Sequence, residues 1–346
     1  MAIRTQRAPR PRRRHHVPAP RPTAMKHLVV CKPNGEFIRH IDPHQISDLL
    51  AAQDHFVWLD MEDPQAGDIA LLQEEFGFHP LAIEDATRSH ERPKVDSYNG
   101  YYFLVFYALK YDVTQQQLAT QAISLFIGKN YLVSVHHGGM PVIDETIKRW
   151  EENQEEFGQN VGALLYALFD AIVDDYFPVV DQLADRVEGL EEQIFEHFQE
   201  ESLQEVFRIK RDLLNARRVV APERDVLNVL IRREVPIFER NTIQYLQDVY
   251  DHVIRVTDSI DNYRDLLSGT LDAFLSVQSN RLNQVVRTLT VTSIVLMSVT
   301  LVAGIYGMNF DFMPELHWRY GYAWALGLMM AISGGLILFF RRIKWL

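Results

Sequence analysis

The sequence predicts an α+β membrane protein with an N-terminal α/β cytoplasmic domain and a long helical stalk that continues into the first of two C-terminal transmembrane helices. Residues 288–310 and 320–340 contain no charged side chain. A helix needs about 20 apolar residues to cross a bilayer and satisfies its own backbone in lipid. Residues 242–305 contain no proline, which favours one helix about 95 Å long that enters the membrane.

The residues before the stalk change character twice. Residues 1–24 are rich in Arg and Pro and predict a disordered basic extension, whereas residues 25–138 alternate between strand and helix patterns and predict the α/β domain. Its strands are expected at 28–31, 56–59, 101–109, 121–127 and 131–135, with a helix at 68–76. Residues 139–241 predict a helical region in the cytoplasm.

The C-terminal third divides at the apolar runs. The stalk helix is expected over 242–310, with its membrane segment at about 288–308. An outer loop at 311–319, a second membrane helix at 320–340 and a basic tail at 341–346 follow.

Charge and composition exclude several classes of function. The net charge is −11 although residues 1–24 carry Arg and no acid, so the remainder is more acidic still. This argues against a nucleic-acid partner and suits a protein that concentrates cations. The single cysteine, Cys31, allows no internal disulfide and no Cys-based zinc site. No Gly-rich phosphate loop or Gly-x-Ser-x-Gly motif is present, so we expect neither an enzyme nor an organic cofactor.

Basic residues flank the cytoplasmic ends of the two predicted membrane helices. Arg287 precedes the first helix, and Arg341, Arg342 and Lys344 follow the second, whereas the outer loop contains the acidic Glu315. The positive-inside rule therefore predicts cytoplasmic termini and an external loop in a bacterial-type inner membrane.

Small, polar and acidic residues recur every seven positions along the stalk. A heptad repeat keeps one helix face toward a partner, and polar residues inside a membrane face another helix or a water-filled path. The pattern predicts a pore lining, and an ordinary helix-packing face is the alternative. Leu289 and Met297 could form a hydrophobic constriction that gates by dewetting. The predicted lining residues are Asp272, Asn283, Val286, Leu289, Ser293, Met297 and Thr300.

A short motif at the end of the first membrane helix carries a family resemblance. Tyr306-Gly307-Met308-Asn309 is followed by Phe-Asp-Phe-Met-Pro-Glu-Leu at 310–316 and by a basic ending at 341–346. Between two C-terminal membrane helices, this pattern resembles the CorA family of divalent-cation channels. The resemblance extends over about residues 25–346.

This resemblance implies a homopentameric funnel whose long first membrane helix lines the pore. The implied substrate is Mg²⁺, with Co²⁺ or Ni²⁺ as further substrates, and lipid and divalent cations are the implied partners. Tyr306, Gly307, Met308 and Asn309 would form the selectivity loop. Because Mg²⁺ dehydrates reluctantly, a ring of Asn309 amide oxygens would accept hydrogen bonds from its hydration shell.

The resemblance also implies that cytoplasmic Mg²⁺ binds between subunits and closes the pore. Glu84 and Asp85 match one side of that regulatory site, Asp248 matches the other, and Asp170 is a weaker match. Two alternatives remain, namely a zinc transporter of the ZntB branch and a membrane-anchored coiled-coil scaffold.

Overall fold

The computed structural model describes residues 24–39, 41–52, 55–88, 92–112, 117–153, 160–196, 200–232, 238, 240–309 and 313–345. The predicted basic extension therefore lies outside the described residues apart from Ala24. The chain divides into two compact units. The first unit comprises the described residues up to Leu190 together with Glu200–Arg264, and the second comprises those of Glu191–Gln199 and Asp265–Leu346.

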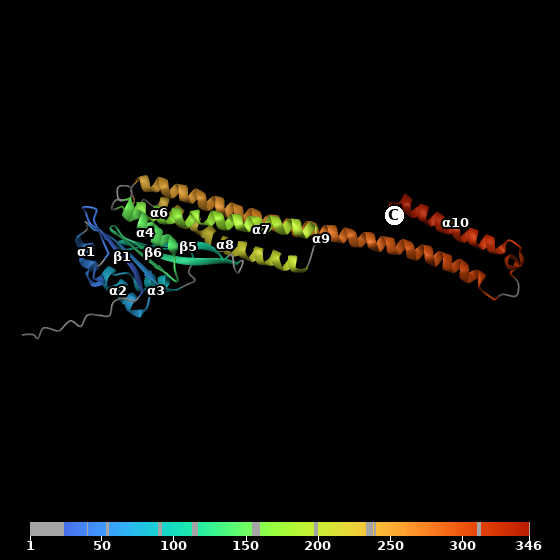
Figure 1. The fold of residues 1–346 in the computed structure, drawn as a ribbon, viewed down its shortest axis with the longest axis horizontal. Helices are drawn as coiled ribbons and strands as arrows, with labels where there is room; N and C mark the ends of the chain where they lie inside the picture. Colours follow the sequence, from blue (N-terminus) through green and yellow to red (C-terminus); the bar gives the residue numbers. More distant parts are fainter. Residues whose placement is uncertain are drawn as a thin grey trace, which may run out of the picture. The chain divides into compact units, whose positions relative to one another are not determined.

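A seven-stranded sheet of order β2-β1-β3-β7-β6-β5-β4 forms the centre of the first unit (Figure 1). Strands β3 and β7 pair in parallel, and the other neighbours pair antiparallel. The predicted strands are present, and each is longer than predicted. The strands are β1 (Met25–Cys31), β2 (Phe37–Ile38), β3 (Phe56–Glu62), β4 (Lys94–Tyr98), β5 (Tyr101–Asp112), β6 (Gln117–Ile127) and β7 (Tyr131–His136).

Helices cover both faces of this sheet, which explains the long apolar runs in its central strands. Phe126 of β6 stacks on Phe78 at 4.1 Å between ring centroids, and Phe106 of β5 stacks on Phe169 at 4.5 Å. Helices α2 (Ala66–Phe76) and α3 (Pro80–Thr87) flank Phe78 in the sequence. Phe78 and Phe169 pack against opposite faces of the sheet. Two further helices, α1 (Ile46–Ala52) and α4 (Pro141–Glu152), complete the layers.

The helical region consists of α6 (Val161–Asp174), α7 (Tyr176–Glu196) and α8 (Glu200–Arg232). Helices α6 and α7 are separated at Asp175, because Pro178 lacks an N–H and its ring would clash with a continuous helix four residues earlier. Arg186 of α7 contacts Asp212 of α8 at 3.0 Å, and Arg217 of α8 contacts Asp261 at 2.6 Å.

A buried carboxyl group joins α8, α7 and β5. Oε1 of Glu223 accepts the Tyr107 backbone N–H at 2.9 Å, and the Tyr176 hydroxyl lies 3.0 Å from Oε2. That hydroxyl also donates to the Tyr107 carbonyl. Burial holds the pKa of Glu223 well above its usual range. A protonated Glu223 satisfies every partner, because its O–H can donate to the Tyr176 hydroxyl oxygen while the Tyr176 hydroxyl donates to the Tyr107 carbonyl.

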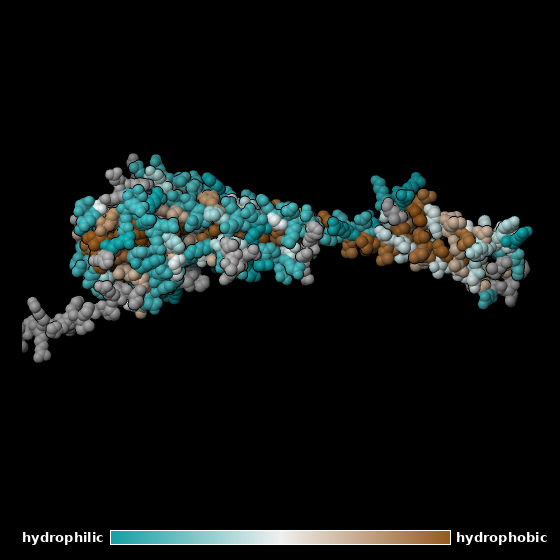
Figure 2. All heavy atoms as spheres, in the orientation of Figure 1, coloured by the Kyte–Doolittle hydropathy of each residue, from teal (hydrophilic) through white to brown (hydrophobic). Residues whose placement is uncertain are grey.

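The predicted long helix is present as α9 (Arg240–Tyr306), which ends four residues before the expected position 310. The second long apolar helix is α10 (Gly321–Arg342). The two helices that are long and apolar enough to cross a membrane are Asn241–Tyr306 and Gly321–Arg342, each with a mean hydropathy of 2.0 over its most apolar window. Figure 2 shows apolar residues, in brown, on the outside of the second unit. Such exposure suits a lipid or protein environment rather than water.

Candidate functional site

The predicted pore-lining residues lie on an uncovered face of α9. All of them are exposed, with Leu289 at 66% and Met297 at 71%. Val291 and Val302, on the other side of the helix, are only 4% and 7% exposed. The predicted lining is therefore free to face water or another subunit, as is most of this stretch of α9, since residues 281–289 are exposed on every side of the helix.

Hydroxyl groups on this part of α9 are oriented by their own helix. Thr300 Oγ1 donates to the Leu296 carbonyl at 2.8 Å, and Thr290 Oγ1 donates to the Val286 carbonyl at 2.8 Å. Since the single hydroxyl proton is used, the oxygen presents only acceptor lone pairs outward. An acceptor surface suits the outward-pointing hydrogens of a hydrated cation.

Gly307 shapes the C-terminal end of α9. Its N–H donates to the Ala303 carbonyl at 2.9 Å, and a Cβ at this position would lie only 3.1 Å from that carbonyl oxygen. Because glycine has no Cβ, the backbone can pass close to the Ala303 carbonyl where the helix ends. Asn309 follows as an exposed residue. Met308 lines an open hollow with Met297, Thr300, Leu301, Gly304 and Ile305. The hollow connects the predicted lining to the predicted selectivity loop.

The described part of the outer loop contains η2 (Pro314–His317). Gly321 opens α10 beneath this turn, where a Cβ would overlap the Glu315 carbonyl oxygen. Glu315 is an exposed residue, and its predicted position outside the membrane stays a prediction.

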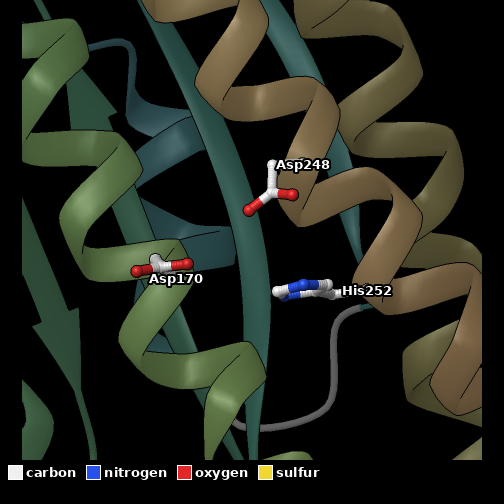
Figure 3. A group of neighbouring side chains, drawn as sticks. All are labelled: Asp170, Asp248 and His252. Atoms are coloured by element: carbon white, nitrogen blue, oxygen red, sulfur yellow. The ribbon is translucent and has the colours of Figure 1, made fainter.

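A second cluster of polar residues lies in the first unit, between α6 and α9. Asp170 of α6 and Asp248 and His252 of α9 bring ligand atoms within 4.8 Å of one another. Figure 3 shows the Asp248 and His252 side chains projecting from one helix toward the helix that bears Asp170. Two carboxylates and an imidazole form a donor set that a divalent cation can occupy.

The electrostatics of this cluster also favour a cation. Burial, followed by repulsion from Asp174 and Asp248, raises the pKa of Asp170. A bound cation would remove the repulsion between the two carboxylates of the cluster, and a proton on Asp170 would do so in part.

His252 is the member that sequence reasoning missed. Its Nδ1 is buried and has no hydrogen-bond partner among the described residues, and the nearest carboxylate oxygen of Asp174 is 3.8 Å away. The available signal was its spacing of four residues from Asp248, which places both on one helix face.

Glu84 and Asp85 are outside this cluster in a single chain. Both belong to α3, where Asp85 contacts Lys94 of β4 at 2.6 Å and Glu84 pairs with Arg88. Their predicted role across a subunit boundary stays a prediction.

Comparison with known proteins decides the family. The model for the CorA-like Mg²⁺ transporter protein matches residues 53–342. The chain belongs to the CorA family. It is therefore a divalent-cation transporter with two membrane helices, and not an enzyme.

Individual relatives support this membership. The cobalt/magnesium transport protein CorA of Thermotoga maritima is 36% identical over 84% of this chain and 83% of its own length. CorA of Methanocaldococcus jannaschii is 24% identical over 86% of this chain and 94% of its own. The complete structure of CorA from Methanocaldococcus jannaschii superimposes with a TM-score of 0.76, covering 92% of this chain and 99% of that chain at 21% identity.

Proposed function

We propose that this CorA protein is a homopentameric channel that imports Mg²⁺, and also Co²⁺ and Ni²⁺, across the inner membrane. The observation that carries the proposal is the row of exposed residues along α9 from Asp272 to Thr300, which Asn309 follows just beyond the end of the helix at Tyr306. A single helix cannot enclose a pore, so subunits must supply the remaining walls. The printed name of the Thermotoga maritima relative, a cobalt/magnesium transport protein, supports these substrates.

Selectivity rests on recognition of a hydrated ion. Neutral amide oxygens of Asn309, at the exposed end of α9, accept hydrogen bonds from the ion's waters without stripping them. Thr300 and Ser293 continue the polar path inward, and Leu289 and Met297 narrow it with apolar side chains. The polar groups attract the ion, and the apolar positions close the path when it dewets.

Import follows the membrane potential when both termini are cytoplasmic. A charge gains about 2.3 kcal/mol per 100 mV, so a divalent ion gains about 4.6 kcal/mol. An open pore of this kind would overload the cell, so closure must respond to internal Mg²⁺.

The regulatory site combines acids from neighbouring subunits. Glu84 and Asp85 of one subunit face Asp248 of the next, with Asp170 and His252 beside Asp248. Without metal these carboxylates repel, and bound Mg²⁺ links the subunits in the closed state.

Ion uptake into liposomes tests the proposed function and separates it from its alternatives. Reconstituted protein is expected to carry Mg²⁺ and Co²⁺ along a negative-inside potential and to carry Zn²⁺ less well. A preference for Zn²⁺ would favour the ZntB branch, which the Met-Pro-Glu-Leu sequence around Glu315 resembles less. No uptake of any divalent ion by correctly assembled protein would favour a scaffold.

A further inference from the structure

The ammonium group of Lys94 already neutralises a carboxylate of the proposed regulatory site. Lys94 Nζ lies 2.6 Å from Asp85 Oδ2, 3.5 Å from Asp96 Oδ2 and 5.7 Å from the centre of the Phe103 ring. We propose that Lys94 is a tethered competitor for the divalent cation at Asp85, and that it sets both the Mg²⁺ threshold and the preference for divalent over monovalent ions. This inference rests on the proposed role of Asp85 as a regulatory ligand.

The fold holds this pair in place. Lys94 is the first residue of β4 and pairs with Val105 of β5, while Asp85 lies in the last turn of α3. The side chains are 30% and 22% exposed. Because both are partly shielded from water, salt screens their attraction less than that of a surface pair.

The charges explain why a monovalent ion does not suffice. A free K⁺ or Na⁺ ion brings the same single charge as the ammonium, which is already present at high effective concentration because it is tethered. A divalent ion adds a second charge, and that charge can engage Asp248 of a neighbouring subunit. Only the divalent ion therefore gains by displacing Lys94.

Asp96 gives the displaced ammonium a second partner. Its carboxylate is already 3.5 Å from Nζ, so a small rotation of the flexible Lys94 stem exchanges Asp85 for Asp96. The exchange leaves no unpaired ammonium. It also frees the carboxylate of Asp85 from the ion pair, so that this carboxylate can bind the metal.

A lysine is suited to this exchange where an arginine is not. The ammonium is a compact point charge on a flexible chain, whereas a guanidinium grips a carboxylate with two parallel hydrogen bonds. The proposal therefore predicts opposite effects for two substitutions. Lys94→Gln removes the competitor, and Lys94→Arg strengthens it.

Protection of the full-length protein from limited proteolysis, measured over a range of Mg²⁺ concentrations in 0.1 M KCl, tests the proposal. Lys94→Gln is expected to lower the half-protecting Mg²⁺ concentration about two- to fivefold, the range of a partly exposed ion pair. Lys94→Arg is expected to raise it. Lys148→Gln is the matched control, because it removes the same charge from an exposed pair with Glu152 and should leave the midpoint unchanged.

The Asp85→Asn variant tests whether Lys94 acts through its contact with Asp85. It should raise the half-protecting concentration, and adding Lys94→Gln to it should cause no further shift. Equal midpoints for Lys94→Gln, Lys94→Arg and the Lys148→Gln control would overturn the competitor role while leaving the Asp85 sensor intact. Absence of Mg²⁺ protection in the unmodified protein would overturn the proposed sensor, and this inference with it.

Discussion

The carboxylate of Asp170 on α6 and that of Asp248 on α9 approach within 4.8 Å, with His252 completing the group. Such a group is costly when empty, because burial and like charges both oppose ionisation of Asp170. A cation bound here would stabilise the contact between the two helices, and this proposal leads to a measurable dependence on pH.

We predict that Mg²⁺ stabilises the protein more at pH 8 than at pH 5. The pKa of Asp170 is higher in the fold than in the unfolded chain. The contribution of Asp170 to the free energy of unfolding is therefore fully present below its unfolded pKa and is lost as the pH rises through its folded pKa. Above that value the carboxylate of Asp170 is charged and can bind the metal. The difference between the unfolding temperatures measured with and without Mg²⁺ should therefore be larger at pH 8.

Asp170→Asn should make the metal-free protein more stable at pH 8 and should reduce the gain from Mg²⁺. Asp258→Asn, at an exposed position of α9, is the matched control and should behave like the unmodified protein. An equal Mg²⁺ gain in both variants would contradict a metal site at Asp170.

The buried Glu223 predicts a second pH effect. Its folded pKa is raised well above the unfolded value by burial, so its contribution to stability is present below the unfolded pKa and is lost as the pH rises through the folded pKa. Glu223→Gln imitates the protonated acid, since its amide can donate to Tyr176 and its oxygen can accept from Tyr107. Its free energy of unfolding, measured by denaturant titration, should fall less than that of the unmodified protein as the pH rises.

Glu223→Leu tests whether the hydrogen bonds matter. It leaves the Tyr107 N–H without its carboxyl acceptor and should cost about 1–3 kcal/mol at every pH. A Leu variant as stable as the Gln variant would contradict the proposed hydrogen-bond network.

A further prediction concerns assembly of the chain into an oligomer. The uncovered face of α9 carries Leu289 and Met297 at 66% and 71% exposure, together with polar residues that are poorly suited to lipid. We expect native mass measurement in detergent to give five copies of the 40.2 kDa chain. A stable monomer or dimer as the sole species would exclude a central pore.

The sequence predicted those features that depend on local pattern. Apolar runs located both membrane helices, and the absence of proline predicted the continuity of α9. The sequence did not predict strands β2 and β4. Strand β2 has only two residues, and β4 is rich in charged and polar residues. The expected helical region at 139–241 did not include the division at Asp175, although Pro178 is a local signal for it.

Contacts between distant segments could not be predicted in the same way. His252 joins Asp170 only because α6 packs beside α9, and Lys94 reaches Asp85 only because β4 lies beside the end of α3. The resemblance supplied Asp85, Asp170 and Asp248, and Lys94 belongs to the Arg-Pro-Lys-Val sequence at 92–95 that follows Asp85 in the matched stretch. Neither the resemblance nor the local pattern showed that Lys94 contacts Asp85 or that His252 lies beside Asp170.

The most direct test of the account is Mg²⁺ uptake into liposomes by the Asn309→Ala variant. Removing the amide from the exposed end of α9 should reduce uptake at least about tenfold, which corresponds to a loss of about 1.4 kcal/mol in recognition of the hydrated ion. His317→Ala, at an exposed position of the outer loop, is the control and should keep normal uptake. We predict a pentameric Asn309→Ala protein that carries little Mg²⁺, and normal uptake by that assembled variant would contradict the account.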